Sequence, residues 1–382
     1  MNIWIDGYEA NVPQRLGSSQ LGFELLCHLE KIDQKNEYTI LLPSAPLPDL
    51  PKERAGWTYK ILKPNKLWTR IALPYALYSA KIKPDLIYSP THYIPRFSPV
   101  RRIVTIFDLS YLHFPEMIPR ADLWKMVNWG KFGIQRADHI ITISNFSRKD
   151  IIKNYKINSE KVTAIYPGYD KNIFKPIKDH KKIDLIKQKY GISGKYIIYI
   201  GTIQPRKNLI RLIEAFKPIE NLKLVIVGKT KGLGREGWMF DEILAKPAKL
   251  GIEDKVIFTG FVPTEELPYL LSEAETFILP SLWEGFGIPA VEAMACGAPV
   301  IVSNVSSLPE VVGNAGLLID PHSTTQIEQA IRTITTDSKI REKRIKAGLE
   351  QAKKYSWNKM AKTLLKVFEL TCAEASASER KK

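Results

Sequence analysis

Residues 276–289 decide how this chain folds. They read Thr276-Phe277-Ile278-Leu279-Pro280-Ser281-Leu282-Trp283-Glu284-Gly285-Phe286-Gly287-Ile288-Pro289. A short apolar run, typical of a buried strand, leads into a loop with two glycines, and Pro289 then begins a helix that Gly297 ends. A strand, a glycine loop and a helix in this order predict a parallel sheet covered by helices.

The same alternation runs through the whole chain. In the first half the predicted strands are Asn2–Ile5, Tyr38–Leu42, Leu86–Tyr88, Arg102–Ile106, His139–Ile143 and Val162–Ile165. In the second half they are Tyr196–Ile200, Lys223–Val227, Val256–Phe258, Thr276–Leu279, Val300–Val302 and Gly316–Leu318. Each half therefore predicts its own doubly wound α/β domain, and 382 residues are enough for two hydrophobic cores.

A glycine- and lysine-rich connection separates the two predicted domains. We expect the first domain at residues 1–175 and the second at 190–355. A C-terminal helix at about residues 358–370 should pack back on the first domain, and the small, polar residues 373–382 predict a disordered tail. Two Rossmann-like domains that face a central cleft bind ligands in the loops that follow their strands.

The net charge is strongly positive and unevenly distributed. The chain has 56 Lys and Arg against 40 Asp and Glu, which gives +16, and most of this excess lies in residues 1–190. No acidic residue occurs between Glu53 and Asp85, where bases alternate with Trp and Tyr. This stretch is typical of a peripheral membrane face, but it fits a soluble lysine-rich surface equally well.

The cysteines and the N-terminus bear on the cellular compartment. Cys27, Cys296 and Cys372 have no spacing typical of disulfides or of a zinc site, which favours a reducing compartment. The chain shows no signal peptide and no apolar run of roughly 18 residues. We therefore expect a cytoplasmic protein whose only membrane contact is peripheral, on the inner face.

The loop at residues 280–289 has the chemistry of an anion site. Gly285 and Gly287 allow backbone amides to approach a ligand, and the helix that follows points free N–H groups the same way. The carboxylates of Glu284 and Glu292 can accept hydrogen bonds from the vicinal hydroxyls of a sugar. For Glu292 the alternative is a structural acid near a helix N-terminus.

A second loop follows the strand at Tyr196–Ile200. It reads Gly201-Thr202-Ile203-Gln204-Pro205-Arg206-Lys207-Asn208. Arg206 and Lys207 at a strand-to-helix turn could hold a diphosphate, Arg through its fork and Lys as a point charge. By themselves two adjacent bases are more often a solvated surface pair.

Together these motifs resemble family 4 glycosyltransferases, which are retaining enzymes with the two-domain GT-B fold. The resemblance rests on Gly201 to Asn208, Gly260-Phe261-Val262, the Glu284 to Glu292 motif and Ala298-Pro299-Val300-Ile301, and it covers about residues 2 to 370. It implies a C-terminal domain that binds a nucleotide diphosphate sugar and an N-terminal domain that binds the acceptor.

The resemblance also implies roles for particular residues in donor binding. Glu284, with the backbone at Gly285, Phe286 and Gly287, would hold the donor sugar, and Glu292 the ribose. Arg206 and Lys207, in the loop that Gly201 opens, would hold the diphosphate. The loop containing Phe261 and Val262 would lie against the base. Many relatives have Arg where this chain has Thr202. Arg206 would therefore contribute more of the diphosphate binding in this chain.

Three positions in the first half complete the predicted site. Gly17 begins a helix that Ser18 or Ser19 can cap, and in similar enzymes this glycine loop lies beside the reacting sugar. Asp108 follows the strand at Arg102–Ile106 and is a candidate catalytic residue. Relatives commonly carry His before this Asp, where this chain has Phe107. His92 is a candidate acceptor-binding residue or a purely structural histidine.

The expected reaction is transfer of a hexose from a nucleotide diphosphate sugar to a hydroxyl with retention of configuration. No residue pattern marks a metal site, so Arg206, Lys207 and the helix N-terminus would stabilise the leaving diphosphate without a metal or another cofactor. Glu284, Lys207, Arg206 and Asp108 are the candidate catalytic residues.

The sequence is also compatible with other functions. A nucleotide-sugar epimerase could share the architecture, a basic non-catalytic protein could bind nucleic acid, and Phe107 permits a catalytically weakened relative. Because no nucleic-acid motif is present, we expect no nucleic acid partner.

The resemblance favours GDP-mannose as the donor. The acceptor would be a glycan or a lipid-linked saccharide in polysaccharide or cell-envelope synthesis. An anionic membrane surface is a further candidate partner, through Arg54–Pro84. Neutralising Lys63, Lys66 and Arg70 should weaken such binding.

Overall fold

The computed structural model describes residues 1–229 and 240–379, with side chains up to Ala373. The chain divides into two compact units. Unit 1 comprises Met1–His113, Arg120–Gly168 and Ser356–Lys382, and unit 2 comprises Phe114–Pro119 and Tyr169–Tyr355. The two predicted domains thus correspond to separate units, and the C-terminal helix belongs to the first.

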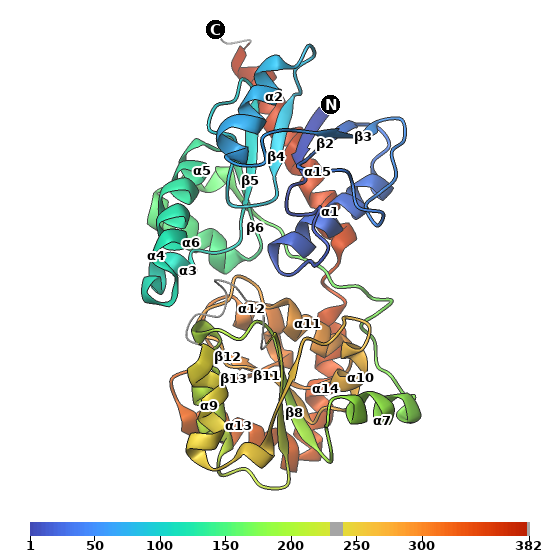
Figure 1. Ribbon diagram of the computed structural model, residues 1–382, viewed down its shortest axis with the longest axis vertical. Coiled ribbons are helices and arrows are strands. Elements are labelled where there is room, and N and C mark those ends of the chain that lie inside the picture. Colours follow the sequence, from blue (N-terminus) through green and yellow to red (C-terminus); the bar gives the residue numbers. More distant parts are fainter. Residues whose placement is uncertain (230–239, 380–382) are drawn as a thin grey trace. The chain divides into compact units, whose positions relative to one another are not determined.

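Unit 1 is a parallel sheet with the strand order β3-β2-β1-β4-β5-β6-β7 (Figure 1). The strands are β1 Asn2–Asp6, β2 Glu37–Leu42, β3 Trp57–Ile61, β4 Leu86–Ser89, β5 Arg101–Ile106, β6 His139–Thr142 and β7 Val162–Ala164. The helices are α1 Ser18–Ile32, α2 Leu73–Ser79, α3 Ser110–His113, α4 Arg120–Lys125, α5 Lys131–Arg136, α6 Asn145–Tyr155 and α15 Trp357–Glu379. Two π-helical turns, Trp68–Ala72 and Met126–Gly130, lead into α2 and α5.

The strand β3 is an element that the sequence analysis missed. Trp57–Ile61 pairs in parallel with β2 at the edge of the sheet, where only Trp57 is buried. Its bases and aromatics suggested a surface stretch, but they alternate as an edge strand requires, with one face packed and the other in water.

Unit 2 has the strand order β10-β9-β8-β11-β12-β13, with all neighbours parallel. The strands are β8 Tyr196–Ile200, β9 Lys223–Val227, β10 Val256–Gly260, β11 Thr276–Leu279, β12 Val300–Ser303 and β13 Leu317–Ile319. The helices are α7 His180–Lys189, α8 Leu209–Phe216, α9 Phe240–Leu250, α10 Leu267–Glu273, α11 Ile288–Ala295, α12 Leu308–Val312, α13 Thr324–Thr336 and α14 Ser338–Ala352. All twelve predicted strands are therefore present.

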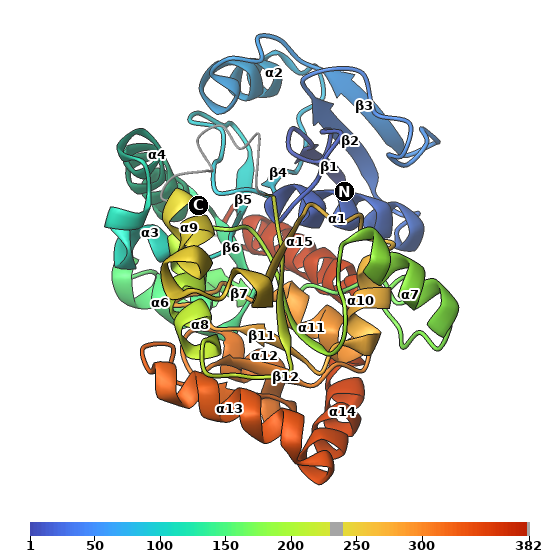
Figure 2. The same cartoon turned by 60° about the horizontal axis from the view of Figure 1, so that its bottom comes forward.

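The helices of unit 2 form two groups, one on each side of the sheet (Figures 1 and 2). In one group α8 packs against α9 and α13, and in the other α11 packs against α10, α12 and α14. The central strands β8 and β11 are completely buried, which is expected when helices cover both faces of a parallel sheet.

The C-terminus differs from the predicted disordered tail. The helix α15 packs against α1 and continues through residue 373 to Glu379. The Ala and Glu residues of this segment have high helix propensity, so the polar composition is compatible with helix extension. Residues 380–382 of the predicted tail lie outside the described residues.

Candidate functional site

The sheet topology of unit 2 singles out the loops after β8 and β11. These strands are neighbours, but the next strand along the chain lies on opposite sides, β9 beside β8 and β12 beside β11. The following loops therefore diverge, and such a switch point is where doubly wound sheets bind ligands. The loops are residues 201–208 and 280–287, the two that the sequence analysis selected.

Three charged side chains from these loops meet at the switch point. Lys207 Nζ donates a hydrogen bond to Glu284 Oε1, and Ser281 Oγ donates a second one to the same oxygen over 2.7 Å. Arg206 Nη1 lies 3.6 Å from Glu284 Oε2 and also donates to the Trp283 carbonyl. The structure thus brings together three of the four candidate catalytic residues.

This cluster keeps Glu284 ionised although the residue is buried. Burial alone would raise the pKa of the Glu284 carboxyl. The positive charges of Lys207 and Arg206, together with the hydrogen bonds from Lys207 and Ser281, outweigh burial, so the pKa lies below its usual value. The site therefore offers a fixed carboxylate beside two cations.

Asn208 ends the motif that begins at Gly201, and it holds this loop in place although no role was predicted for it. It adopts the left-handed conformation, with φ 60°, after the short 3-10 turn Pro205–Lys207. Its Nδ2 donates to the carbonyls of Pro280 and Pro321 over 3.0 and 2.7 Å. Because Asn tolerates positive φ and carries two donors, it connects the loop after β8 to the loops after β11 and β13.

Ser307 is a second residue that the sequence analysis missed. Its hydroxyl lies 2.9 Å from the Glu284 carbonyl and 3.2 Å from the Phe286 carbonyl, while the Glu284 N–H donates to Ser306 Oγ. These contacts come from residues 306–307, just after β12, and fix the glycine loop from the side. No local sequence signal identified them.

The glycine loop leads directly into α11. Gly287 has φ 97°, and a Cβ there would lie 2.8 Å from Leu308 Cδ2, so any larger residue would be strained. The Phe286 ring is buried and packs edge-on against Tyr355 at 5.2 Å between ring centroids. Contact between a ligand and Phe286 would therefore involve its backbone, as the sequence analysis expected.

Glu292 is the fifth residue of α11 and lies just past the first turn in which we expected it, because the helix begins at Ile288, one residue before Pro289. Burial raises the pKa of its carboxyl to about 8. Among the residues that the structure describes, none forms a hydrogen bond or ion pair with this carboxylate, which leaves its oxygens available for an external donor.

The ends of β8, β9 and β10 are held close together by glycines. The Gly201 N–H donates to the Val227 carbonyl, and the Gly228 N–H donates to the Gly260 carbonyl, each over 3.0 Å. A Cβ on Gly228 would lie 2.3 Å from the Gly201 carbonyl oxygen. Beyond β10, Phe261 is exposed whereas Val262 is buried in the core, so only Phe261 offers its side chain to a base.

In unit 1 the switch point lies between β1 and β4. Gly17, after β1, precedes α1 with φ 56°, and a Cβ there would meet no atom within 4 Å. The predicted cap is wrong: no side chain caps α1, since Ser18 Oγ donates to Glu9 and Ser19 Oγ to the Leu16 carbonyl. The glycine is thus required by the backbone and faces open space.

Asp6 is a further residue that the sequence analysis left without a role. It ends β1, and burial raises the pKa of its carboxyl to about 7 despite hydrogen bonds from the Tyr8 N–H and from Trp68 Nε1. The only signal in the sequence is an Asp directly after a buried strand.

His92, Phe107 and Asp108 lie together at the ends of β4 and β5. The Phe107 N–H donates to His92 Nε2 over 3.3 Å, and the two rings stack at 5.3 Å between centroids. Burial lowers the pKa of His92, although the negative charge of Asp108 opposes this shift. Asp108 Oδ1 accepts from the Ser110 N–H and so shapes the turn into α3.

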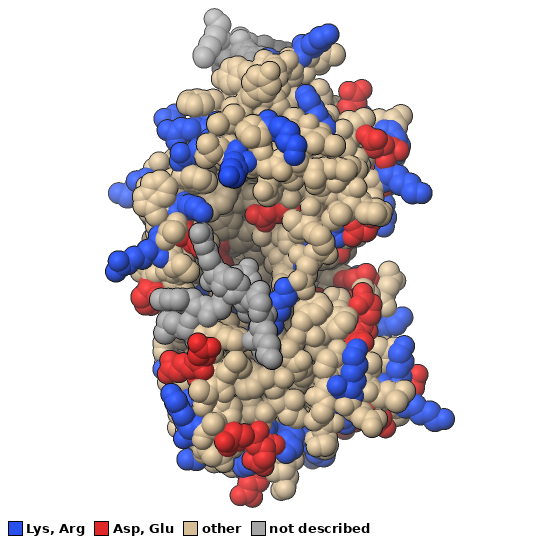
Figure 3. Space-filling view, in the orientation of Figure 1, with Lys and Arg blue, Asp and Glu red and all other residues tan. Residues whose placement is uncertain are grey.

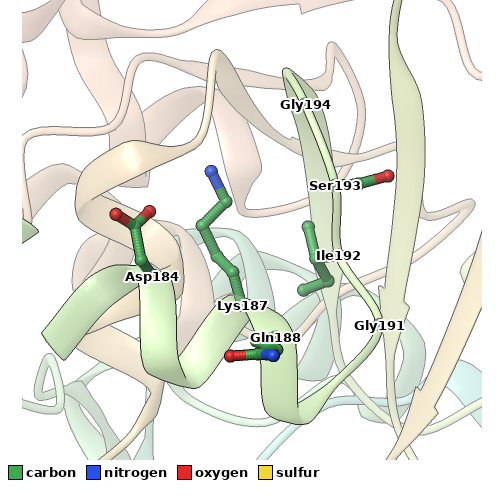
Figure 4. A pocket seen from close by; sticks show the side chains of 7 residues that line it. All are labelled: Asp184, Lys187, Gln188, Gly191, Ile192, Ser193 and Gly194. Atoms are coloured by element: carbon green, nitrogen blue, oxygen red, sulfur yellow. The ribbon is translucent and has the colours of Figure 1, made fainter. Parts of the chain in front are cut away.

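A cavity of about 400 Å³ elsewhere in unit 2 lies beside α7 (Figure 4). It is lined by residues of α7 and by Gly191–Gly194, which precede β8. It is therefore at the amino edge of the sheet, opposite the strand ends that carry Arg206 and Lys207. Because doubly wound sheets bind ligands at the carboxyl edge, we assign this cavity no role.

Comparison with known proteins gives the same division of the chain. A sequence profile described as Glycosyltransferase Family 4 matches residues 19–172, and one described as glycosyl transferases group 1 matches residues 182–351. Anabaena Alr3699/HepE, solved in complex with UDP and glucose, has a TM-score of 0.75 at 20% identity, covering 96% of this chain and 99% of that one. This similarity confirms the predicted GT-B fold.

Two relatives are similar in sequence. The chain is 34% identical over 292 residues to O-antigen chain mannosyltransferase B of Escherichia coli, across 75% of this chain and 74% of the relative. It is 29% identical over 250 residues to O-antigen chain mannosyltransferase RfbU of Salmonella typhimurium, across 65% and 64% of the two chains. The resemblance inferred from the motifs is thereby confirmed: the chain belongs to glycosyltransferase family 4, and its reaction is glycosyl transfer.

Proposed function

We propose that this enzyme transfers mannose, with retention, from a nucleotide diphosphate sugar to a hydroxyl of a glycan or lipid-linked acceptor during polysaccharide synthesis. Both relatives described above are O-antigen chain mannosyltransferases, which supports mannose and a cell-envelope glycan. The complex of Alr3699/HepE with UDP and glucose supports a nucleotide-sugar donor. The donor we propose is GDP-mannose: the relatives support mannose, and the guanine nucleotide follows only from the motif resemblance.

The observation that carries the proposal is the ionised Glu284 between Lys207 and Arg206. A donor sugar can give hydroxyl hydrogen bonds to the carboxylate, while its diphosphate takes the N–H donors of the two cations. The N-terminus of α11 adds backbone dipoles at the same strand ends. Charge that develops on the leaving diphosphate would therefore be stabilised by groups already in position.

The proposed step needs no protein nucleophile and no metal ion. The bond between the anomeric carbon and the diphosphate oxygen breaks, and the acceptor oxygen bonds to that carbon on the same face. The acceptor proton passes to the leaving diphosphate oxygen, so atoms and charge balance. Arg206 and Lys207 stabilise the diphosphate during this step. Asp108 remains a candidate for orienting the reacting groups.

The other donor contacts follow from the same placement. The Glu292 carboxyl group, which has no partner among the described residues, suits the two hydroxyls of a ribose, and hydrogen bonds from them would favour its ionised form. The exposed Phe261 ring suits one face of the base. In unit 1, His92 offers its ring to the acceptor.

A donor screen tests this function. Purified enzyme is incubated with GDP-mannose, UDP-glucose and other nucleotide sugars, with and without a lipid-linked saccharide, and the anomeric configuration of the product is read by NMR. We expect transfer from GDP-mannose with retention, at an unchanged rate after treatment with EDTA. Glu284→Gln should be inactive and the exposed control Glu265→Gln active. A fully active Glu284→Gln enzyme would contradict the proposal, and donor conversion without any acceptor would favour an epimerase.

We further propose that the enzyme works in the cytoplasm, bound to the inner face of an anionic membrane. None of the helices in the described part of the chain is long and apolar enough to cross a bilayer. Around α2, however, apolar side chains are exposed: Leu67, Ile71, Tyr75, Tyr78 and Ile82. Ile71 on the turn before α2 and Tyr75 and Tyr78 on α2 are four and three residues apart, so they share one face.

Basic residues accompany this apolar face. Lys66 and Lys81 flank it and are exposed, and Figure 3 shows Lys and Arg side chains over the part of unit 1 around α2. Sedimentation with anionic and neutral vesicles tests the idea. We expect salt-sensitive binding to anionic vesicles that is weakened in Lys66→Glu/Lys81→Glu and in Tyr75→Ser. If all variants sediment with anionic vesicles to the same extent as the wild type, or if the wild type does not bind vesicles, the membrane proposal fails. The excess positive charge would then serve only solubility.

A further inference from the structure

Unit 1 contains a cavity of about 290 Å³ that the proposed donor site does not use. Three segments line it: the turn Trp68–Ala72 before α2, the loop after β4, and the helical stretch from α4 to α5. The Arg96 N–H donates to the Thr69 carbonyl over 2.8 Å and connects the first two segments. The cavity is therefore built from parts of the chain that the fold holds together.

Two arginines of this cavity carry guanidinium groups without a charged partner. Arg70 stacks over the Trp129 ring at 4.3 Å, and Arg96 lies 5.4 Å from the Phe132 centroid. Neither side chain forms a hydrogen bond or an ion pair with any described residue, and the lining contains no acid. Because a stacked guanidinium keeps its N–H edge free, the pair can bind an anion in a bidentate manner.

The remaining lining is aromatic. Trp129 packs edge-on against Tyr93 at 5.8 Å and against Trp124 at 6.5 Å, and the Trp124 side chain is largely exposed. The Trp129 Nε1 donor is buried without a hydrogen-bond partner. Aromatic faces suit the apolar C–H face of a pyranose ring, and a free N–H suits one of its hydroxyls. The lining thus combines an anion site with a sugar site.

The neighbours of the cavity indicate where such a ligand would come from. Tyr93 directly follows His92, the predicted acceptor residue. The turn that contributes Arg70 also carries the exposed Ile71, and Leu67 precedes it. A ligand with its anionic group on Arg70 could thus keep a lipid chain against the proposed membrane face.

We propose that this cavity binds the diphosphate and the adjoining sugar of a lipid-diphosphate-linked acceptor. Arg70 and Arg96 hold the phosphate oxygens, and Trp124 and Trp129 pack on the sugar. Arg70 and Arg96 are thus specificity residues for the acceptor. This inference rests on the proposed function, because it names the acceptor class of the same enzyme.

The first experiment measures binding in the absence of any donor. A short-chain lipid-diphosphate saccharide is titrated into the full-length protein, and quenching of tryptophan fluorescence is followed. Arg70→Gln/Arg96→Gln should raise the dissociation constant about tenfold or more, since charge-assisted hydrogen bonds are lost. Arg136→Gln, an exposed arginine of unit 1 outside the cavity, should leave it unchanged. Inorganic diphosphate should compete weakly, because it lacks the sugar; competition as strong as that of the full ligand would contradict the sugar contact.

The second experiment measures transfer to two acceptors that differ only in the diphosphate. The double variant should show a raised KM for the diphosphate-linked acceptor and an unchanged KM for the same saccharide on a neutral alkyl chain. Its KM for the donor should match the wild type. Equal effects on both acceptors, or none on either, would overturn the inference.

The two experiments separate this inference from the proposed function. If the wild-type protein binds the diphosphate saccharide through Arg70 and Arg96 but transfers no sugar, the proposed function fails and the cavity assignment stands. If transfer proceeds normally and the double variant binds and uses the acceptor like the wild type, the cavity assignment fails and the function stands.

Discussion

Lys207 and Glu284 are 77 positions apart in sequence, yet their side chains form a hydrogen-bonded ion pair that is almost completely buried. Each residue comes from a loop that follows a strand, and the two strands, β8 and β11, are neighbours in the sheet. The ion pair keeps the Glu284 carboxylate of the candidate donor site ionised in the absence of a ligand.

The pair should respond to mutation as a unit. Lys207→Met leaves the buried carboxylate with weaker compensation and should destabilise unit 2 by about 3 kcal/mol, the usual loss when one partner of a buried pair is removed. Lys207→Met/Glu284→Gln should regain part of this stability, because the buried carboxylate is gone while Arg206 keeps its hydrogen bond to the Trp283 carbonyl. Thermal unfolding of the single and double variants measures the coupling, with the exposed Lys217→Met as control. Strictly additive losses would show that the two side chains act independently.

Glu292 should make stability depend on pH. Its pKa is raised by burial from 4.5 to about 8, so the folded state favours the protonated carboxyl. Since the unfolded chain releases this proton near pH 4.5, the contribution of Glu292 to stability falls as the pH rises from about 4.5 to 8. Glu292→Gln should therefore gain melting temperature relative to the wild type above pH 8 and little below pH 4.5. The same variant should bind GDP-mannose more weakly; a constant stability difference across this range would be inconsistent with the buried carboxyl.

His92 should act as a neutral acceptor of a hydrogen bond. Its folded pKa lies below 6.5, so the unfolded chain binds the proton more readily, and stability is lost as the pH falls below about 6.5. Protonation also converts Nε2 to a donor and breaks the bond from the Phe107 N–H. His92→Gln should remove this acidic limb from the stability profile and raise the KM for the acceptor. An unchanged acidic limb in the variant would refute this role of His92.

Asn208 can be tested with two substitutions. Asn208→Gly keeps the left-handed backbone but loses the hydrogen bonds to Pro280 and Pro321, a cost of about 1 kcal/mol each. Asn208→Ala loses the same bonds and adds about 1 kcal/mol of backbone strain. Chemical denaturation should therefore rank stability as wild type, then Gly, then Ala. If Asn208→Ala and Asn208→Gly are equally stable, the positive φ at position 208 does not affect stability.

Gly17 offers a test of function separate from stability. Gly17→Ala should destabilise unit 1 because φ 56° with ψ −114° lies outside the regions that Ala adopts, although the new methyl group meets no atom. Gly191 also has a positive φ, 68°, and open space around it, so Gly191→Ala is a control for an added methyl group at a positive-φ glycine. Both variants should lose stability in thermal unfolding, while only Gly17→Ala should lose transfer activity. Equal activity of the two would indicate a purely structural glycine at position 17.

The sequence predicted the architecture well because its signals are local. Buried parallel strands appear as short apolar runs, and all twelve predicted ones are present. The strand β3 was missed because an edge strand buries few side chains, so its sequence resembles that of an exposed loop. The prediction that the chain becomes disordered from residue 373 was wrong. Small and polar residues are common both in disordered tails and in the exposed ends of helices, so composition does not distinguish the two.

The sequence predicted which residues belong to the candidate site, but not which of their side chains are in contact. Arg206, Lys207 and Glu284 were selected from two separate loops, and the roles given to them and to Glu292, Phe261, Gly17 and Asp108 stay predictions. Ser307 and the cavity around Arg70 and Trp129 had no local signature, because each depends on neighbours that are remote in the chain. The only signal for Asp6 was its place directly after a buried strand.

By itself, the amino-acid sequence determined the two α/β domains, the loops that carry the chemistry and the family to which the chain belongs. Hydrophobic periodicity, glycine loops and motif spacing are properties of neighbouring residues, and they survive without knowledge of the fold. Only the tertiary structure decided that Lys207 and Arg206 keep Glu284 ionised, that Glu292 tends toward the neutral form, and that two unpaired arginines share an aromatic cavity. These properties arise from burial and from distances between distant segments, which only the strand order β8–β11 and β1–β4 establishes.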